Sequence, residues 1–74
     1  MKVDRYEGEG GTGFRAGDMI AYMGACRAIY GRKARVKRID IIHGDTIATV
    51  ELVADGRELC VMCRECKQVI GGDR

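Results

Sequence analysis

The stretch that decides the fold is residues 33–53, KARVKRIDIIHGDTIATVELV. Apolar and polar residues alternate over most of it with a period of two, which is typical of half-buried β-strands. The alternation changes phase near Lys37 and Arg38, so we expect a β-bulge that bends the first strand sharply. The HGD tripeptide in the middle predicts a turn. The stretch is therefore predicted to form a bent hairpin with strands at 33–42 and 46–53.

Downstream of this hairpin, the dipeptide DG at 55–56 is a second turn signal and predicts a return strand at 57–62. The residues that follow show two conflicting patterns. A stripe of apolar residues from Leu59 onward favours a helix, whereas the hairpin turn favours a strand first. A short helical turn at 63–67, followed by a short strand at 68–70, satisfies both signals.

Upstream of the hairpin, residues 19–23 are predicted to form a strand, followed by a long loop centred on 24–31. The apolar residues here also fall at helical spacing behind the N-cap candidate Asp18, so a helix over 18–30 is the alternative. Gly24 disfavours the helix, because glycine inside a helix costs about 1 kcal/mol relative to alanine. The favoured order of strand, loop, hairpin, return strand, helical turn and short strand is that of an SH3-like barrel, which hides its sheet edges.

Composition narrows the class of protein. The chain has 74 residues, of which 46% are hydrophobic, and this fits one small globular domain with a marginal core. No apolar run approaches the roughly 20 residues of a membrane helix, and the first residues lack the apolar part of a secretion signal. We therefore expect a cytoplasmic location, where thiols stay reduced. The chain contains no serine and one histidine, and we expect no enzymatic activity.

Positive charge is concentrated in one part of the chain, although the net charge is only +2. Six basic residues and no acid fall between positions 27 and 38, which indicates a face for an anionic partner. Tyr22 and Tyr30 are candidates for stacking on a base, as in proteins that bind single strands, with core packing as the alternative. A solvated strand and loop would show the same charge pattern. The candidate contact residues are Arg27, Tyr30, Arg32, Lys33, Arg35, Lys37 and Arg38.

A resemblance to the KOW motif covers residues 14 to 70. It rests on GDMIAYMG at 17–24 and on YGRKARVKRI at 30–39, and it departs from the motif at Ala34, where glycine is usual. The motif occurs in transcription elongation factors and large-subunit ribosomal proteins. The resemblance implies a mainly β fold, namely a small SH3-like (KOW/Tudor-like) five-stranded barrel with a short helical turn near the C-terminus.

The N-terminal segment differs from the rest in composition. Residues 1–13 contain four glycines among glutamate and threonine, which predicts a flexible, glycine-rich arm. We expect the barrel to occupy 14–71 and residues 72–74 to form a short tail.

Three of the four cysteines lie close together in the sequence. Cys60, Cys63 and Cys66 are spaced by three, which brings side chains to one side of a tight helical turn, and Cys26 in the long loop is a candidate fourth ligand. A tetrahedral site of four thiolates would bind zinc and stabilise a short chain. An iron–sulfur cluster fits the spacing less well. The alternative is that Cys60 and Cys66 are buried small apolar residues.

These observations lead to two hypotheses on function. The first is a non-enzymatic module that binds nucleic acid, with RNA as the first choice, or that belongs to the transcription or translation machinery. The second is a protein-interaction module, a small regulator or inhibitor that docks on a larger enzyme with the same basic face and is stabilised by zinc. The expected partner is RNA or a larger nucleoprotein or enzyme complex, and not a membrane. The sequence leaves the oligomeric state open.

Overall fold

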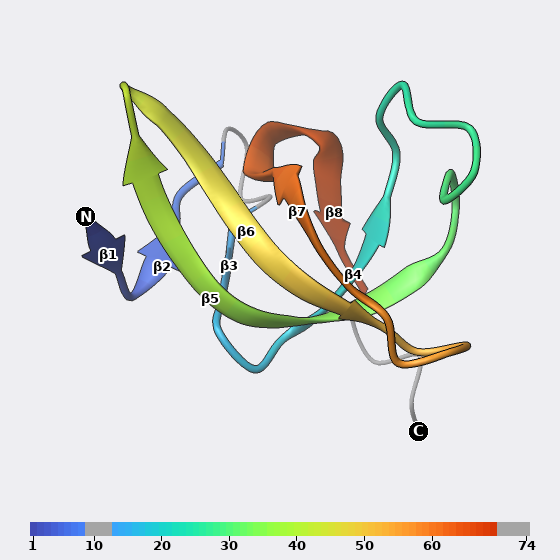
Figure 1. Ribbon diagram of the computed structural model, residues 1–74. Coiled ribbons are helices and arrows are strands. Elements are labelled where there is room, and N and C mark those ends of the chain that lie inside the picture. The colour runs from blue at the N-terminus through green and yellow to red at the C-terminus, as the bar shows by residue number, and fades with distance from the viewer. Residues whose placement is uncertain (9–12, 70–74) are drawn as a thin grey trace.

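The hairpin predicted from the sequence is the centre of the fold (Figure 1). The computed structural model describes residues 1–8 and 13–69. Its strands are β1 (Lys2–Val3), β2 (Arg5–Tyr6), β3 (Phe14–Arg15), β4 (Met19–Tyr22), β5 (Lys33–Ile42), β6 (Asp45–Leu52), β7 (Glu58–Met62) and β8 (Cys66–Gln68). A 3₁₀ turn, η2, spans Cys63–Glu65 between β7 and β8. The described residues thus confirm the predicted mainly β fold, and none of their segments forms a helix with the length and apolar character that a membrane crossing requires.

The β5–β6 hairpin curves across the molecule (Figure 1). Its register shifts between Val36 and Arg38, which confirms the predicted bulge. The extra residue allows Val36 and Ile39, which are an odd number of positions apart, both to point into the core. The turn at the tip holds His43 and Gly44 at φ of 51° and 83°, the left-handed pair of a tight two-residue hairpin.

The segments for which the sequence left helix and strand open are mostly strand. Residues 19–22 form β4, so the strand interpretation of this part is confirmed. Near the C-terminus a 3₁₀ turn precedes a short strand, as predicted, but both begin or end earlier than expected, at 63–65 and 66–68. The physical reason is that β8 starts pairing with β4 as soon as the turn has reversed the chain.

The main sheet of the described residues has six strands, in the order β7-β6-β5-β4-β8, with β1 added beside β5. A separate ladder joins β2 and β3. The end strands β7 and β8 do not pair with each other, so the prediction of a barrel closed by hydrogen bonds is wrong. The reason lies in η2, which carries the chain away from β7, so that β8 pairs with β4 instead.

The N-terminal residues extend this sheet. β1 pairs with the second half of β5, and β2 pairs with β3. Residues 1–8 therefore carry two short strands where the sequence predicts part of a flexible arm at 1–13. β5 extends past the residues that pair with β4. Along that part of its edge, its backbone groups pair with β1 instead. Residues 9–12 of the arm, and 70–74 with the predicted end of the barrel and the tail, lie outside the described residues.

Inward-facing side chains of several strands fill the core. The largest fully buried ones are Ile20, Val36, Ile39, Val50 and Cys63. Ile29, in the loop between β4 and β5, is also buried and packs in the same cluster. The core therefore fixes the position of this loop, which carries much of the basic stretch.

Candidate nucleic-acid interface

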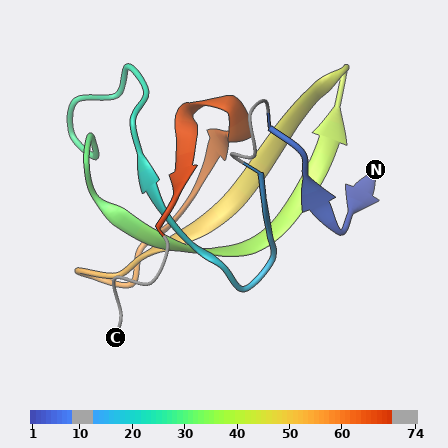
Figure 2. The same ribbon diagram turned by 180° about the vertical axis from the view of Figure 1, so that it is seen from behind.

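The loop between β4 and β5 projects at the side of the molecule opposite the N-terminus (Figures 1 and 2). Two hydrogen bonds close its base: Gly31 N–H donates to the Tyr22 carbonyl at 2.6 Å, and Tyr22 N–H donates to the Arg32 carbonyl at 3.0 Å. Between them the chain makes tight turns, with Ile29 N–H donating to the Cys26 carbonyl at 3.2 Å. Turns of this kind place residues three apart on the same side.

The inner side of the loop is anchored to η2. Tyr22 is buried, and its hydroxyl donates a hydrogen bond to Glu65 Oε1 at 3.0 Å while it accepts one from Cys26 N–H at 3.1 Å. Gly24 approaches this pair so closely that an added Cβ would collide with the Tyr22 hydroxyl and the Glu65 carboxylate. The glycine that disfavours a helix in the sequence is thus required for the loop to pack on η2.

The outer side of the loop carries an aromatic ring and a cation. Gly24, Arg27 and Tyr30, which are three residues apart, line an open hollow of about 530 Å³. Tyr30 is 56% exposed, whereas Tyr22 is 6% exposed and belongs to the core. Of the two tyrosines considered for base stacking, Tyr30 therefore lies where a ligand can reach it.

Three further cations follow at the end of the loop and the start of β5. All three are exposed, and Arg35 also donates from Nη1 to the Gly17 carbonyl at 3.2 Å. Within the part of the chain that the structure describes, neither they nor Arg27 belong to an ion pair. We call this set the loop face; it consists of Arg27, Tyr30, Arg32, Lys33 and Arg35.

The last two cations of the predicted site, Lys37 and Arg38, are held by carboxylates. Lys37 Nζ lies 3.7 Å from both Glu51 Oε1 and Glu58 Oε2. Arg38 binds both carboxylate oxygens of Asp40, at 2.7 and 3.1 Å, and these hydrogen bonds lower the pKa of the Asp40 carboxyl. The structure therefore does not group these two cations with the loop face. For Lys37 the cause is the sheet register, which sets Glu51 opposite Glu58, with both within reach of Lys37; for Arg38 it is the position of Asp40 two residues further along the same strand.

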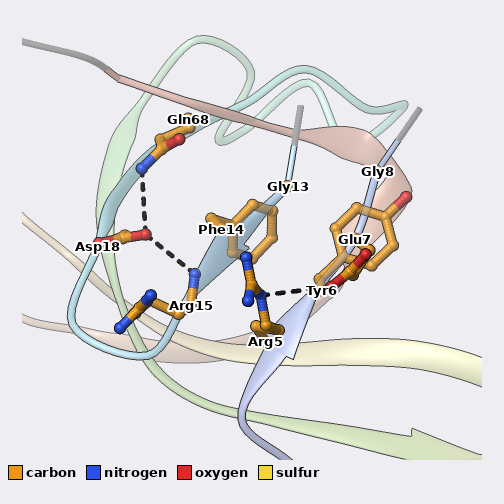
Figure 3. A pocket seen from close by; sticks show the side chains of 9 residues that line it. All are labelled: Arg5, Tyr6, Glu7, Gly8, Gly13, Phe14, Arg15, Asp18 and Gln68. Atoms are coloured by element: carbon orange, nitrogen blue, oxygen red, sulfur yellow. Dashed lines mark hydrogen bonds and ion pairs between the residues drawn. The ribbon is translucent and has the colours of Figure 1, made fainter. Parts of the chain in front are cut away.

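A separate cleft of about 320 Å³ lies beside β2 and β3 (Figure 3). Asp18 Oδ2 accepts hydrogen bonds there from the Arg15 backbone N–H at 2.9 Å and from Gln68 Nε2 at 3.1 Å. Arg5 Nε lies 3.5 Å from the Glu7 carboxylate. Asp18 and Glu7 thus bring two carboxylates to this cleft, and their negative charge disfavours an anionic ligand there.

The four cysteines lie in two different environments. All are free thiols; Cys26 and Cys60 are exposed, whereas Cys63 and Cys66 are buried. Among the described residues, which include all four, no three histidine, cysteine, aspartate or glutamate side chains gather to hold a metal ion. The four thiols therefore do not form one cluster, and the zinc site, with its iron–sulfur alternative, stays a prediction. Burial is confirmed for Cys66 and wrong for Cys60, whose Sγ lies 3.7 Å from Thr49 Oγ1 in an exposed contact.

Burial of the two inner thiols leads us to expect a loss of stability at alkaline pH. It raises the pKa of Cys63 from 9.0 to about 11, and burial, with the neighbouring Cys63 and Glu65, raises that of Cys66 to about 12. The unfolded chain loses these thiol protons near pH 9, while the folded chain keeps them. Their contribution to stability is thus complete below about pH 9 and is lost as the pH rises toward the folded values.

Urea denaturation at several pH values measures this effect. A double variant, Cys26→Ala with Cys60→Ala, keeps both inner thiols and should show the same alkaline fall in the free energy of unfolding. Cys66→Ala should show a shallower one. An unchanged slope in Cys66→Ala would contradict the assignment to the buried thiols.

Comparison with known protein families, curated proteins and solved structures finds no match for this chain. We therefore infer function from the loop face itself. All five of its residues are among the predicted contact residues, but the sequence interpretation missed the acids that neutralise Lys37 and Arg38. One signal for them was present, because Asp40 follows Arg38 by two positions and so lies on the same face of the strand.

Proposed function

We propose that this chain is an SH3-like module that binds single-stranded nucleic acid, RNA in the first instance, through the loop face. The observation that carries the proposal is the exposed ring of Tyr30, which lines one hollow together with Arg27. A base can stack on an exposed tyrosine while neighbouring cations contact phosphates, and proteins that bind single strands commonly combine these two features.

The order of the strands supports the SH3-like part of the proposal. β4, the β5–β6 hairpin and β7 follow one another, and η2 separates β7 from the short β8, which returns to pair with β4. This is the order expected for the KOW-like barrel that the sequence resembles. In this order the loop face belongs to the long loop after β4 and to β5, the strand that follows.

In the proposed complex each part of the loop has a separate role. Tyr30 stacks on one unpaired base, Arg27 contacts a phosphate next to it, and the remaining cations of the loop face contact further phosphates. Such contacts position a strand without reading base edges, so binding should depend little on sequence. The hydrogen bonds of Tyr22 hold the loop in place before a ligand arrives, which lowers the cost of ordering it on binding.

Fluorescence anisotropy with a short labelled oligouridine tests this function. If all four cations of the loop face contact phosphates, the logarithm of the binding constant should fall with the logarithm of salt concentration with a slope of about −3. A duplex RNA of the same length should bind more weakly, because its bases are stacked and cannot reach Tyr30. Absence of binding to single-stranded RNA and DNA at low salt, or equal binding of the duplex, would contradict the proposal.

A further inference from the structure

Among the residues that the structure describes, no strand pairs with the edge of β7 that faces away from β6. β7 ends the main sheet, and Leu52 N–H donates to the Arg57 carbonyl at 2.8 Å just before the strand begins. Because hydrogen-bonded pairs alternate in an antiparallel ladder, the backbone groups of Glu58 and Cys60 point outward from the sheet. Within the described residues, no backbone hydrogen bond outside the ladders involves either of them. We call this row of backbone groups the β7 edge.

A groove of about 410 Å³ lies between β7 and the inner side of the loop. Its lining is largely apolar, with Leu59 and Val61 on the strand side and Ala28 and Ile29 on the loop side. Native proteins usually protect a free strand edge with lysine, proline or a covering segment, because such an edge can pair with another chain. The β7 edge contains neither lysine nor proline. Edge and groove together can thus receive a backbone and, beside it, apolar side chains.

Charge at the groove is divided between its two ends. Arg57 lines the end where β7 begins. In the described part of the chain a single carboxylate, that of Asp55, lies 3.5 Å from its guanidinium, whereas Lys37 lies between two; both groups are exposed, so a ligand carboxylate can compete for Arg57. Glu65 lines the end beyond β7, where its carboxylate already accepts the hydrogen bond of the Tyr22 hydroxyl. The cation is therefore the charge that a ligand can use. A segment with apolar side chains and one carboxylate can fill the apolar groove and pair with Arg57. An RNA strand, by contrast, brings no aliphatic side chains for the groove.

We propose that the β7 edge docks an extended segment of a partner protein, which adds as a strand beside β7. Alternate side chains of this segment are apolar and enter the groove, and an aspartate or glutamate lies next to Arg57. Backbone hydrogen bonds supply affinity in this mode of recognition, and the alternate side chains supply specificity. This docking goes beyond nucleic-acid binding, because Arg27 and Tyr30 line the hollow on the other side of the loop and not this groove.

A display library of random peptides, selected on the immobilised full chain, provides the probe, and the enriched peptides are then synthesised. Cys60→Pro removes one outward N–H but no bond to β6, since proline is tolerated where the N–H of an edge strand faces solvent. Cys60→Val keeps that N–H and is the matched control. We expect the peptides to bind Cys60→Pro about tenfold more weakly than Cys60→Val, the effect of losing one hydrogen bond to a buried peptide. Arg57→Glu should weaken the acidic peptides to a similar extent.

N-methylation of alternate peptide residues tests the same edge on the wild-type chain, so the answer does not depend on the folding of the proline variant. One methylation frame should abolish binding and the other should leave it unchanged, because alternate N–H groups of an added strand face β7. Enrichment of no peptide, equal affinities for Cys60→Pro and Cys60→Val, or equal tolerance of both frames would overturn the proposal.

Two further measurements distinguish this proposal from dimerisation of the chain and from peptide binding at the loop face. A dimer that forms with rising concentration and is blocked by Cys60→Pro but not by Cys60→Val would overturn it in favour of a second copy of the chain. Tyr30→Ala should leave peptide affinity unchanged while it weakens RNA binding, so failure of one function is distinguishable from failure of the other. A parallel loss of peptide affinity in Tyr30→Ala would place the peptide on the loop face and contradict docking at the β7 edge.

Discussion

Replacing Tyr30 by alanine should weaken the binding of single-stranded RNA by roughly tenfold to a hundredfold, because one base stacked on an aromatic side chain contributes about 1–3 kcal/mol. Tyr30 is 56% exposed, so the substitution should leave the core intact. The free energy of unfolding should therefore stay within about 0.5 kcal/mol of the wild-type value. Fluorescence anisotropy measures the affinity for RNA, and urea denaturation measures the free energy of unfolding.

Two controls make this expectation specific. Tyr30→Phe keeps the ring and should bind RNA nearly as well as the wild-type chain. Lys33→Ala and Lys37→Ala form a matched pair on the same strand; Lys37 lies between the carboxylates of Glu51 and Glu58, and the loss of affinity should be larger for Lys33→Ala. Equal losses from the two lysine variants would contradict the division of the cations, and full affinity in Tyr30→Ala would exclude stacking.

Replacing Ile39 by alanine should lower the free energy of unfolding by about 2–5 kcal/mol, the range for removing a large aliphatic side chain from a packed core. The residue is fully buried, directly after the bulge, where β5 pairs with both β1 and β6. A small domain has a total stability of about 5–15 kcal/mol, so this loss would remove a large part of the free energy of unfolding. Urea denaturation followed by circular dichroism measures it.

Ile41→Ala is the control for this variant. It removes the same atoms from the same strand, but Ile41 is 37% exposed near the tip of the hairpin. Its loss should stay below about 1.5 kcal/mol, because part of its surface is already in contact with water. Equal losses from Ile39→Ala and Ile41→Ala would contradict the position of the core described above.

The central hairpin was predictable because its signals are local. Alternation, a change of phase and turn residues can each be read within a few positions, and the phase change at Lys37 and Arg38 locates the bulge without knowledge of the partner strand. The stretch around Gly24 lacked such a signal, since its apolar residues fit helical spacing as well as a strand. Its structure depends on packing against Glu65, which is distant in the sequence.

The candidate site was predictable in its residue types but not in its extent. A run of cations is visible in the sequence, and so is the tyrosine among them. Whether Lys37 is available depends on acids of two other strands, and the exposure of Tyr30 rather than Tyr22 depends on the turns of the loop. The cysteine spacing did not reveal that η2 buries Cys63 and Cys66 while β7 leaves Cys60 exposed.

The sequence by itself determined the bent hairpin, the mainly β class and the basic stretch, because alternation, turn residues and charge are properties of neighbouring residues. Tertiary structure alone decided that Lys37 lies between two carboxylates, that no described strand pairs with the outer edge of β7, and that a groove forms beside that edge. These features arise from cross-strand register and from the packing of a loop on a distant turn. Both bring together residues that are far apart along the chain.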